Sequence, residues 1–208
     1  MTSLEISKAD FDAYLKRLEA SIADAEQHLA VPHGTLASIL NDSDYIAILK
    51  MHATVEPLLN ELLEKNVLRV LSHPKVSFPG GDTLAEFILK RNIDEKRTLA
   101  LKFELISSTR ATFIRRLTET RNHYAHNIKN ASLLIGEIAK KISPKDDGLV
   151  VMTGLCGSVY KSGSPAGRDL FYRTYLHYSF AGFLHEAMPG INPPPAQPIL
   201  SGLFEPGQ

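Results

Sequence analysis

The chain has 208 residues and lacks several features that would assign it to a class at once. It has one cysteine, Cys156, so a disulfide framework and a cysteine-based zinc site are both excluded. The uncharged stretch at residues 148–160 is too short and too rich in glycine to span a bilayer. The first residues lack the basic, apolar and small-residue order of a signal peptide. We therefore expect a cytoplasmic protein with no membrane contact.

An excess of charge of one sign is also absent, because 23 Lys and Arg residues balance 23 Asp and Glu residues. This balance excludes a protein coated with positive charge for sequence-independent nucleic-acid binding. The charges are unevenly distributed, however. Residues 1–30 carry six acids against three bases, whereas residues 108–130 carry five bases against one acid. The zero net charge thus results from two segments of opposite charge, and it allows a focused basic site.

Hydrophobic residues make up 44% of the chain, enough for a substantial core without disulfides. Through the first two thirds they recur at the spacing of amphipathic helices. Helices are predicted over residues 4–29, 45–71, 83–90, 94–106, 108–126, 132–142 and 168–188. Pro57 predicts a kink or short break near residues 52–56.

Two segments depart from the helical pattern. Residues 143–167 are rich in Gly, Ser and Lys, and Leu149 to Met152 has the character of a strand, so a long loop or small hairpin is predicted near 145–167. Prolines predict an irregular tail over residues 189–208. The sequence therefore predicts one all-α domain over 1–208. It would be an antiparallel helical bundle with its core at about 42–188 and an extra N-terminal helix.

The basic segment at residues 108–130 carries the strongest signal for function. One face of its predicted helix presents Phe113, Ile114, Leu117, Tyr124, Ala125 and Ile128. Arg121 shares this apolar face, where a guanidinium is costly unless it is paired or faces a cleft or a partner. Asn122 and His126 are four residues apart and therefore neighbours. Arg121 and His126 lie about 140° apart on a regular helix. They converge only if the helix bends, the arginine swings round, or two copies face each other.

These three side-chain types suit metal-free cleavage of RNA. An imidazole moves protons near neutral pH, and an arginine binds a phosphate through two parallel hydrogen bonds. An asparagine can orient either group or the substrate. The 2′-hydroxyl of RNA supplies the nucleophile, which DNA lacks.

The stretch Arg121-Asn122-His123-Tyr124-Ala125-His126 resembles the R-x-x-x-x-H motif of the HEPN superfamily (higher eukaryotes and prokaryotes nucleotide-binding). The match is to the form with a polar residue directly after the arginine. HEPN domains are all-α bundles, and many are metal-independent endoribonucleases of toxin-antitoxin, abortive-infection, restriction and CRISPR systems. They dimerise so that two copies of the motif form one composite site. The resemblance covers about residues 42–142, including Glu56 on the preceding long helix.

The resemblance implies a role for each motif residue. Arg121 would contact the phosphate, His126 would be the catalytic histidine, and Asn122 would support them. The products would carry a 2′,3′-cyclic phosphate and a 5′-hydroxyl. The expected partners are RNA, a second copy of the chain, and an antitoxin or other defence-system protein. Ile128 stands where one HEPN subtype has a tyrosine that its antitoxin modifies, which counts against that kind of antitoxin.

Further substrate contacts are expected around the motif. His123 is a polar neighbour of the site and Lys129 a nearby cation, while Arg115 and Arg116 would contact phosphates if the helix lines a groove. We expect no cofactor and no metal, because Glu119 alone offers His123 and His126 a carboxylate at a suitable local spacing. The stretch at residues 157–163 lacks the G-x-x-x-x-G-K-[ST] order of a phosphate-binding loop.

Three other interpretations stay open. Arg121 and His126 could simply stabilise the end of a helix, where basic residues are favoured. The chain could be a non-catalytic HEPN-like module for RNA binding or dimerisation in a defence or regulatory complex. It could also be a scaffold whose tail, with Leu200, Leu203 and Phe204 among prolines, docks on a partner protein.

Overall fold

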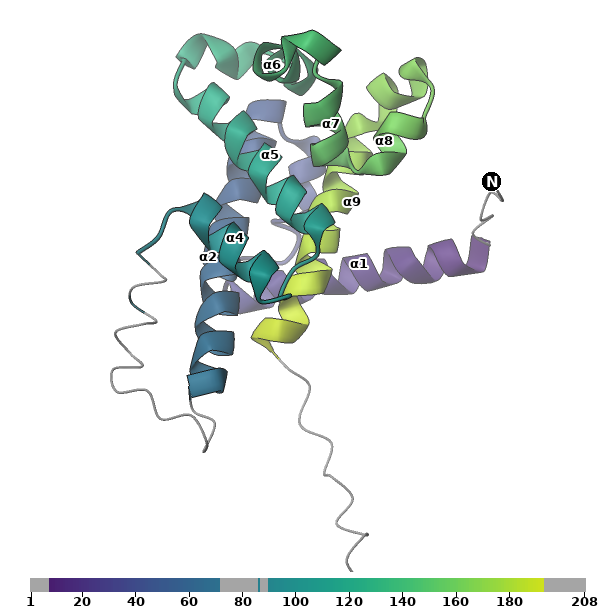
Figure 1. The fold of residues 1–208 in the computed structure, drawn as a ribbon. Coiled ribbons are helices and arrows are strands. Elements are labelled where there is room, and N and C mark those ends of the chain that lie inside the picture. The colour runs from purple at the N-terminus through teal and green to yellow at the C-terminus, as the bar shows by residue number, and fades with distance from the viewer. Residues whose placement is uncertain (1–7, 72–85, 87–89, 193–208) are drawn as a thin grey trace, which may run out of the picture.

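In a computed structural model of the chain, the described residues are 8–71, 86 and 90–192 (Figure 1). The regular elements of this part of the chain are all helices, which confirms the predicted all-α class. None of the described helices is long and apolar enough to cross a membrane. The elements are α1 (Lys8–His28), the 3₁₀ helix η1 (Ala37–Asn41), α2 (Asp44–Leu71), α4 (Ile93–Lys102), α5 (Ser108–Ala125), η2 (Ile128–Ser132), α6 (Ile135–Ile142), η3 (Pro144–Asp146), α7 (Leu149–Cys156), α8 (Ser158–Ser162) and α9 (Pro165–Ile191).

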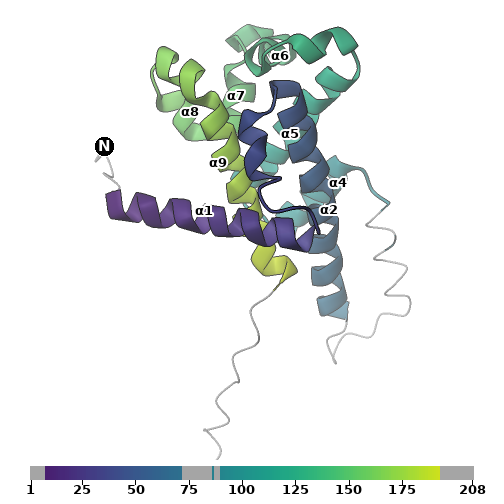
Figure 2. The same ribbon diagram turned by 180° about the vertical axis from the view of Figure 1, so that it is seen from behind.

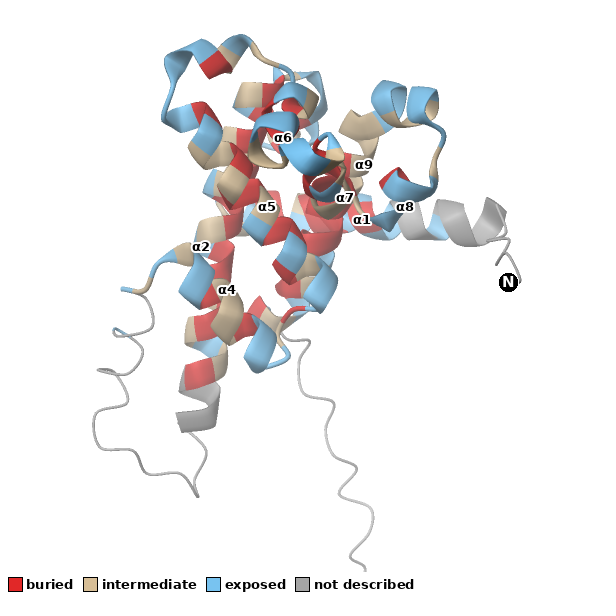
Figure 3. Ribbon diagram, turned by 45° about the horizontal axis from the view of Figure 1, so that its top comes forward, coloured by how far each residue is buried: buried red, intermediate tan, exposed pale blue. Residues whose placement is uncertain are grey.

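The core lies where α2, α5, α7 and α9 pack together. The buried residues, coloured red on the ribbon in Figure 3, are concentrated in these helices. Fully burying one large apolar side chain stabilises the fold by about 1.5–3 kcal/mol. The largest contributors include Leu58, Leu59, Leu62, Phe113, Leu117, Leu155, Phe180 and Phe183. This packing fixes α5, which carries the predicted motif, against α2 on one side and α7 on another.

A buried carboxylate at the start of α2 joins three elements. Asp44 accepts hydrogen bonds from the backbone N–H of Ile135 at 2.7 Å and from the Tyr172 hydroxyl at 2.8 Å. It also forms an ion pair with Arg173 at 2.5 Å. The second guanidinium nitrogen of Arg173 donates to the carbonyls of residues 39, 40 and 42. This Asp44–Arg173 clasp therefore holds α2, α6 and α9 in place.

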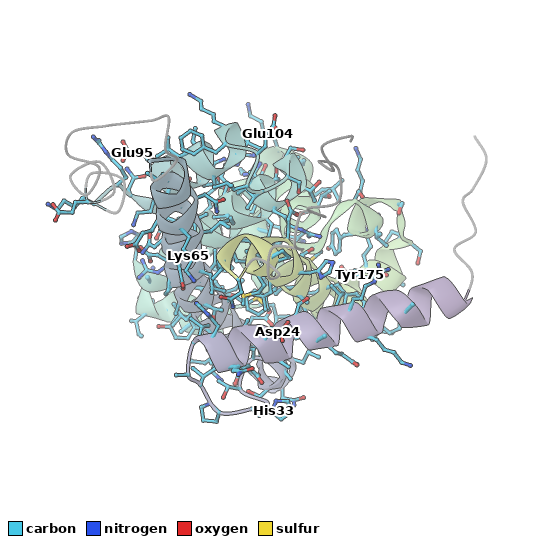
Figure 4. The ribbon with its side chains drawn as sticks, turned by 90° about the horizontal axis from the view of Figure 1, so that it is seen from below. Asp24, His33, Lys65, Glu95, Glu104 and Tyr175 are labelled. Atoms are coloured by element: carbon cyan, nitrogen blue, oxygen red, sulfur yellow. The ribbon has the colours of Figure 1, made fainter. Side chains whose placement is uncertain are left out.

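α1 packs across α9, and its first turns project beyond the remaining helices (Figure 2). Seen from below, Asp24 lies on α1 and Lys65 on α2 (Figure 4). Lys65 also donates to the carbonyl of Ile191 at 3.0 Å. Buried Glu26 accepts from the N–H groups of Gly34 and Leu36 at 2.8 and 2.7 Å, so its carboxylate fixes the turn that follows α1.

The predicted loop or hairpin near 145–167 is wrong, since this segment forms η3, α7, α8 and the first turn of α9. Helix α7 buries Val151, Met152, Leu155 and Cys156 between α5 and α9. Val150 and Val151 are β-branched and locally favour a strand. A helix forms instead because it buries Val151, Met152, Leu155 and Cys156 on one face. Gly148 and Gly157 flank α7 with φ of 79° and 82°, which glycine adopts without strain.

Other boundaries also differ from prediction. α2 runs unbroken through Pro57 and α9 continues past Pro189, because both prolines are exposed and water can satisfy the carbonyls that lose an N–H partner. The helix predicted to reach residue 106 ends at Lys102, and Glu104 has φ of 56°. The predicted helix at 83–90 falls almost entirely outside the described residues, and the tail from 193 onward does so completely.

Candidate functional site

The motif lies at the C-terminal end of α5. The Ser107 side chain accepts a hydrogen bond from the backbone N–H of Arg110 and caps the start of this helix. Phe113, Ile114, Leu117 and Tyr124 are buried as their spacing predicted. Ala125 and Ile128 are instead exposed, because the α-helix ends at Ala125 and its periodicity stops there.

Arg121 and Asn122 are in direct contact. Nη1 of the Arg121 guanidinium donates to Oδ1 of Asn122 at 3.2 Å. Both side chains are half-buried. Within residues 8–71, 86 and 90–192, no carboxylate lies within ion-pair distance of Arg121. A half-buried cation with this arrangement has free N–H donors for an anionic ligand.

His126 follows as the cap of α5. Its backbone N–H donates to the carbonyl of Asn122 at 3.0 Å, while its imidazole is exposed and makes no hydrogen bond to the described residues. The structure thus joins Arg121 to Asn122 through their side chains but does not join Arg121 to His126 by a hydrogen bond. The imidazole is accessible to substrate or to a second copy of the chain.

A second histidine, His52 on α2, faces the same region and was not predicted from the sequence. Its Nδ1 lies 3.9 Å from Oε2 of Glu56, one turn further along α2. Burial lowers the pKa of His52 below its usual value; the Arg121 charge lowers it further and the Glu56 charge opposes both. His52 therefore stays neutral at neutral pH and can accept a proton. Its spacing of four from Glu56 was the available signal, but that spacing alone is common on helices.

Of the other predicted substrate contacts, Arg115 and Arg116 lie apart from Arg121. Arg116 donates to Glu119 at 2.6 Å, and Arg115 lies 3.9 Å from the same carboxylate. On α5, Arg115 and Arg116 point about 120–140° away from Arg121. Both line a hollow of about 350 Å³ between α5 and α7. His123 and Lys129 are exposed beside the motif, and their side chains form no ion pair with the described residues.

A serine and a histidine lie in contact in a larger hollow of about 890 Å³ between α1 and the end of α9. Ser21 Oγ lies 3.0 Å from Nδ1 of His185. The same hydroxyl donates to the carbonyl of Arg17 at 2.9 Å, so its proton is already engaged and Nδ1 must act as the donor to Ser21. This pair therefore lacks the arrangement of a nucleophile with its general base.

The titratable residues of the described chain form no cluster of three or more His, Cys, Asp or Glu side chains suited to a metal ion. Comparisons with family models, with curated proteins and with solved structures find no match to this chain.

Proposed function

We propose that this protein is a metal-independent endoribonuclease of HEPN type that works as a homodimer in the cytoplasm, in a toxin or antiviral defence role. The observation that supports this proposal best is the state of Arg121. Its guanidinium is hydrogen-bonded to Asn122 and has no carboxylate partner in the described chain, and the exposed His126 follows five residues later. An arginine that shares the apolar face of a helix is costly unless it is paired or faces a cleft or a partner.

In the proposed reaction, the N–H groups of Arg121 bind the scissile phosphate and stabilise the charge that builds on it. Asn122 holds the guanidinium in position through its side-chain oxygen. His126 takes the proton from the 2′-hydroxyl, whose oxygen then attacks phosphorus. The bond from phosphorus to the 5′-oxygen breaks, and that oxygen receives a proton from the second copy of His126. The products are a 2′,3′-cyclic phosphate and a 5′-hydroxyl.

The proposal uses two copies of α5 because Arg121 and His126 of one chain lie about 140° apart around a regular helix and are not hydrogen-bonded to each other. The segment 108–130 carries five bases against one acid, so two such segments repel each other. A bound RNA strand supplies the anionic charge that offsets this repulsion. His52 lies beside Arg121 and offers a neutral imidazole as a further proton acceptor in the same region.

The proposal is tested by incubating the protein with single-stranded RNA in the presence of EDTA. Wild type should release fragments with cyclic phosphate ends, and His126→Ala should be slower by about 10²–10⁴-fold. Lys102→Ala is the control, since the Lys102 side chain is exposed, lies outside the motif and forms no ion pair with the described residues. The proposal is wrong if wild type leaves the RNA intact or if His126→Ala cleaves as well as wild type.

The second candidate is a non-catalytic HEPN-like module for RNA binding or dimerisation. The exposed His126 imidazole has no hydrogen-bond partner among the described residues that would orient it as a general base, which favours this candidate. This candidate predicts RNA binding that is unchanged in Arg121→Ala and His126→Ala, with no cleavage by wild type or by either variant.

A further inference from the structure

A second cationic feature lies on α5, on the side that faces α7 and α8 (Figure 1). It is the hollow of about 350 Å³ between these helices, here called the α5–α7 groove. From α5 it is lined by Thr112, Arg115 and Arg116, and from the opposite side by Thr153 and Lys161, among others. α8 follows α7 after a single glycine and thereby brings Lys161 to the groove.

The groove is close-packed where Arg116 crosses α7. A Cβ atom added to Gly154 would lie 2.5 Å from Cγ of Arg116, so glycine is required there for α7 to pack against the arginine stem. The stem is therefore held by packing while the guanidinium remains at the groove. This arrangement positions a cation at reproducible geometry, which a freely solvated arginine does not do.

The charges of the groove are not balanced. Arg115 and Arg116 share one carboxylate, Glu119, and the exposed Lys161 has no ion pair with the described residues. Nε of Arg116 and the hydroxyl of Thr153 are buried without a hydrogen-bond partner in the described chain, so the anion would meet the terminal nitrogens of the cations and not these atoms. Three cations with one anion form a site for an anion.

The lining residues favour a phosphate over a base. The side chains that line the groove include hydroxyls, cations and the aliphatic residues Leu149 and Val150, but no aromatic ring on which a base could stack. Contacts of this kind position a nucleic-acid backbone without reading its sequence. A free nucleotide would leave its base without a stacking partner, so the strand is the better-matched ligand.

The position of the groove on α5 relates it to the motif. Arg116 precedes Arg121 by five residues, about 7.5 Å along the helix axis and about 140° around it. A strand that crosses the end of α5 at Arg121 and follows the helix surface would reach the groove within a few nucleotides. We infer that the α5–α7 groove binds backbone phosphates of single-stranded RNA beyond the cleavage centre. This inference rests on the proposed function for its choice of RNA.

The test measures binding of a 12-nucleotide single-stranded RNA to full-length protein carrying His126→Ala, which keeps the RNA intact. Arg115→Ala/Lys161→Ala removes two exposed cations of the groove. Lys16→Ala/Lys102→Ala is the matched control, because it removes two exposed cations elsewhere. The groove variant should bind on the order of tenfold more weakly at 0.1 M salt, and the slope of log affinity against log salt should fall by about 1.4. Melting temperatures within a few degrees of the parent confirm that both variants fold.

Equal RNA affinity of the groove variant and the control would overturn the inference. It is also overturned if the groove variant loses affinity for ATP while its RNA affinity matches the control, because the ligand is then a free nucleotide. These readouts depend on binding alone. Loss of RNA affinity in the groove variant therefore supports the groove even if wild type fails to cleave RNA, whereas the proposed nuclease would then be wrong.

Discussion

Two arginines of this protein, Arg173 and Arg121, have opposite environments. Arg173 is paired with buried Asp44 and donates to three backbone carbonyls, so its donors are used inside the fold. Arg121 makes one hydrogen bond, to the neighbouring Asn122, and has no carboxylate partner among the described residues. The comparison separates a guanidinium that holds helices together from one whose donors are free for a ligand. It predicts that removing the first costs stability and removing the second costs activity.

The largest effect is expected from Arg173→Ala. This change leaves the buried Asp44 carboxylate without its ion pair and should lower the free energy of unfolding by about 3–5 kcal/mol. Chemical denaturation with far-UV circular dichroism measures the loss. If the free energy of unfolding falls by less than about 1 kcal/mol, Arg173 does not hold the helices together, and its contrast with Arg121 is wrong.

The next effect is expected from Arg121→Ala. We predict that RNA cleavage slows by about 10²–10³-fold, as for the loss of a donor to developing negative charge. Its unfolding free energy should change by no more than about 0.5 kcal/mol, because no ion pair is broken. Arg121→Lys keeps the charge but loses the paired donors, so cleavage should recover only in part. If Arg121→Ala is destabilised and cleaves RNA as fast as wild type, Arg121 is a structural residue and its donors do not serve a ligand.

A smaller effect is expected from the pH dependence of stability. Burial lowers the pKa of His177, and Nδ1 of this side chain has no hydrogen-bond partner in the described chain. The unfolded state therefore binds a proton more readily than the folded state. The free energy of unfolding falls as the pH drops below the ordinary histidine pKa of about 6.5. Thermal melting from pH 7.5 to 5 should show a steeper decline for wild type than for His177→Leu. Parallel curves would contradict the assigned cause.

The smallest effect is expected at Ile128. Its side chain is 82% exposed, although its spacing placed it on the apolar face of the predicted helix. Ile128→Ser should therefore change the free energy of unfolding by no more than about 0.5 kcal/mol. Denaturation at low protein concentration measures this change. A loss of more than about 1 kcal/mol would mean that the side chain is buried after all, and the sequence-based assignment would then be the better one.

Local patterns predicted much of this fold. The apolar spacing at Phe113, Ile114 and Leu117 and the end of the helix near His126 depend on residues a few positions apart. The same local spacing makes Asn122 a neighbour of Arg121 and of the His126 backbone. Such features are readable from sequence because the helix relates positions i, i+3 and i+4 by fixed geometry.

Contacts between distant segments could not be predicted in this way. His52 lies in α2, almost seventy positions before Arg121, and its altered pKa depends on how α2 packs against α5. The partners of Asp44 are 91, 128 and 129 positions away. No local pattern predicts the effect of Arg121 on His52 or the contacts of Asp44, because each depends on the packing of whole helices.

The sequence by itself determined that the chain is helical and that a basic motif with Arg121, Asn122 and His126 lies at the end of one helix. Tertiary structure alone decided the conformation of residues 144–162, where a short apolar run became α7 because a helix buries it between α5 and α9, and α8 follows packed on α7 and α9. It also decided which arginine is paired and which is free. Pairing depends on what other helices bring alongside a side chain, and only packing determines that.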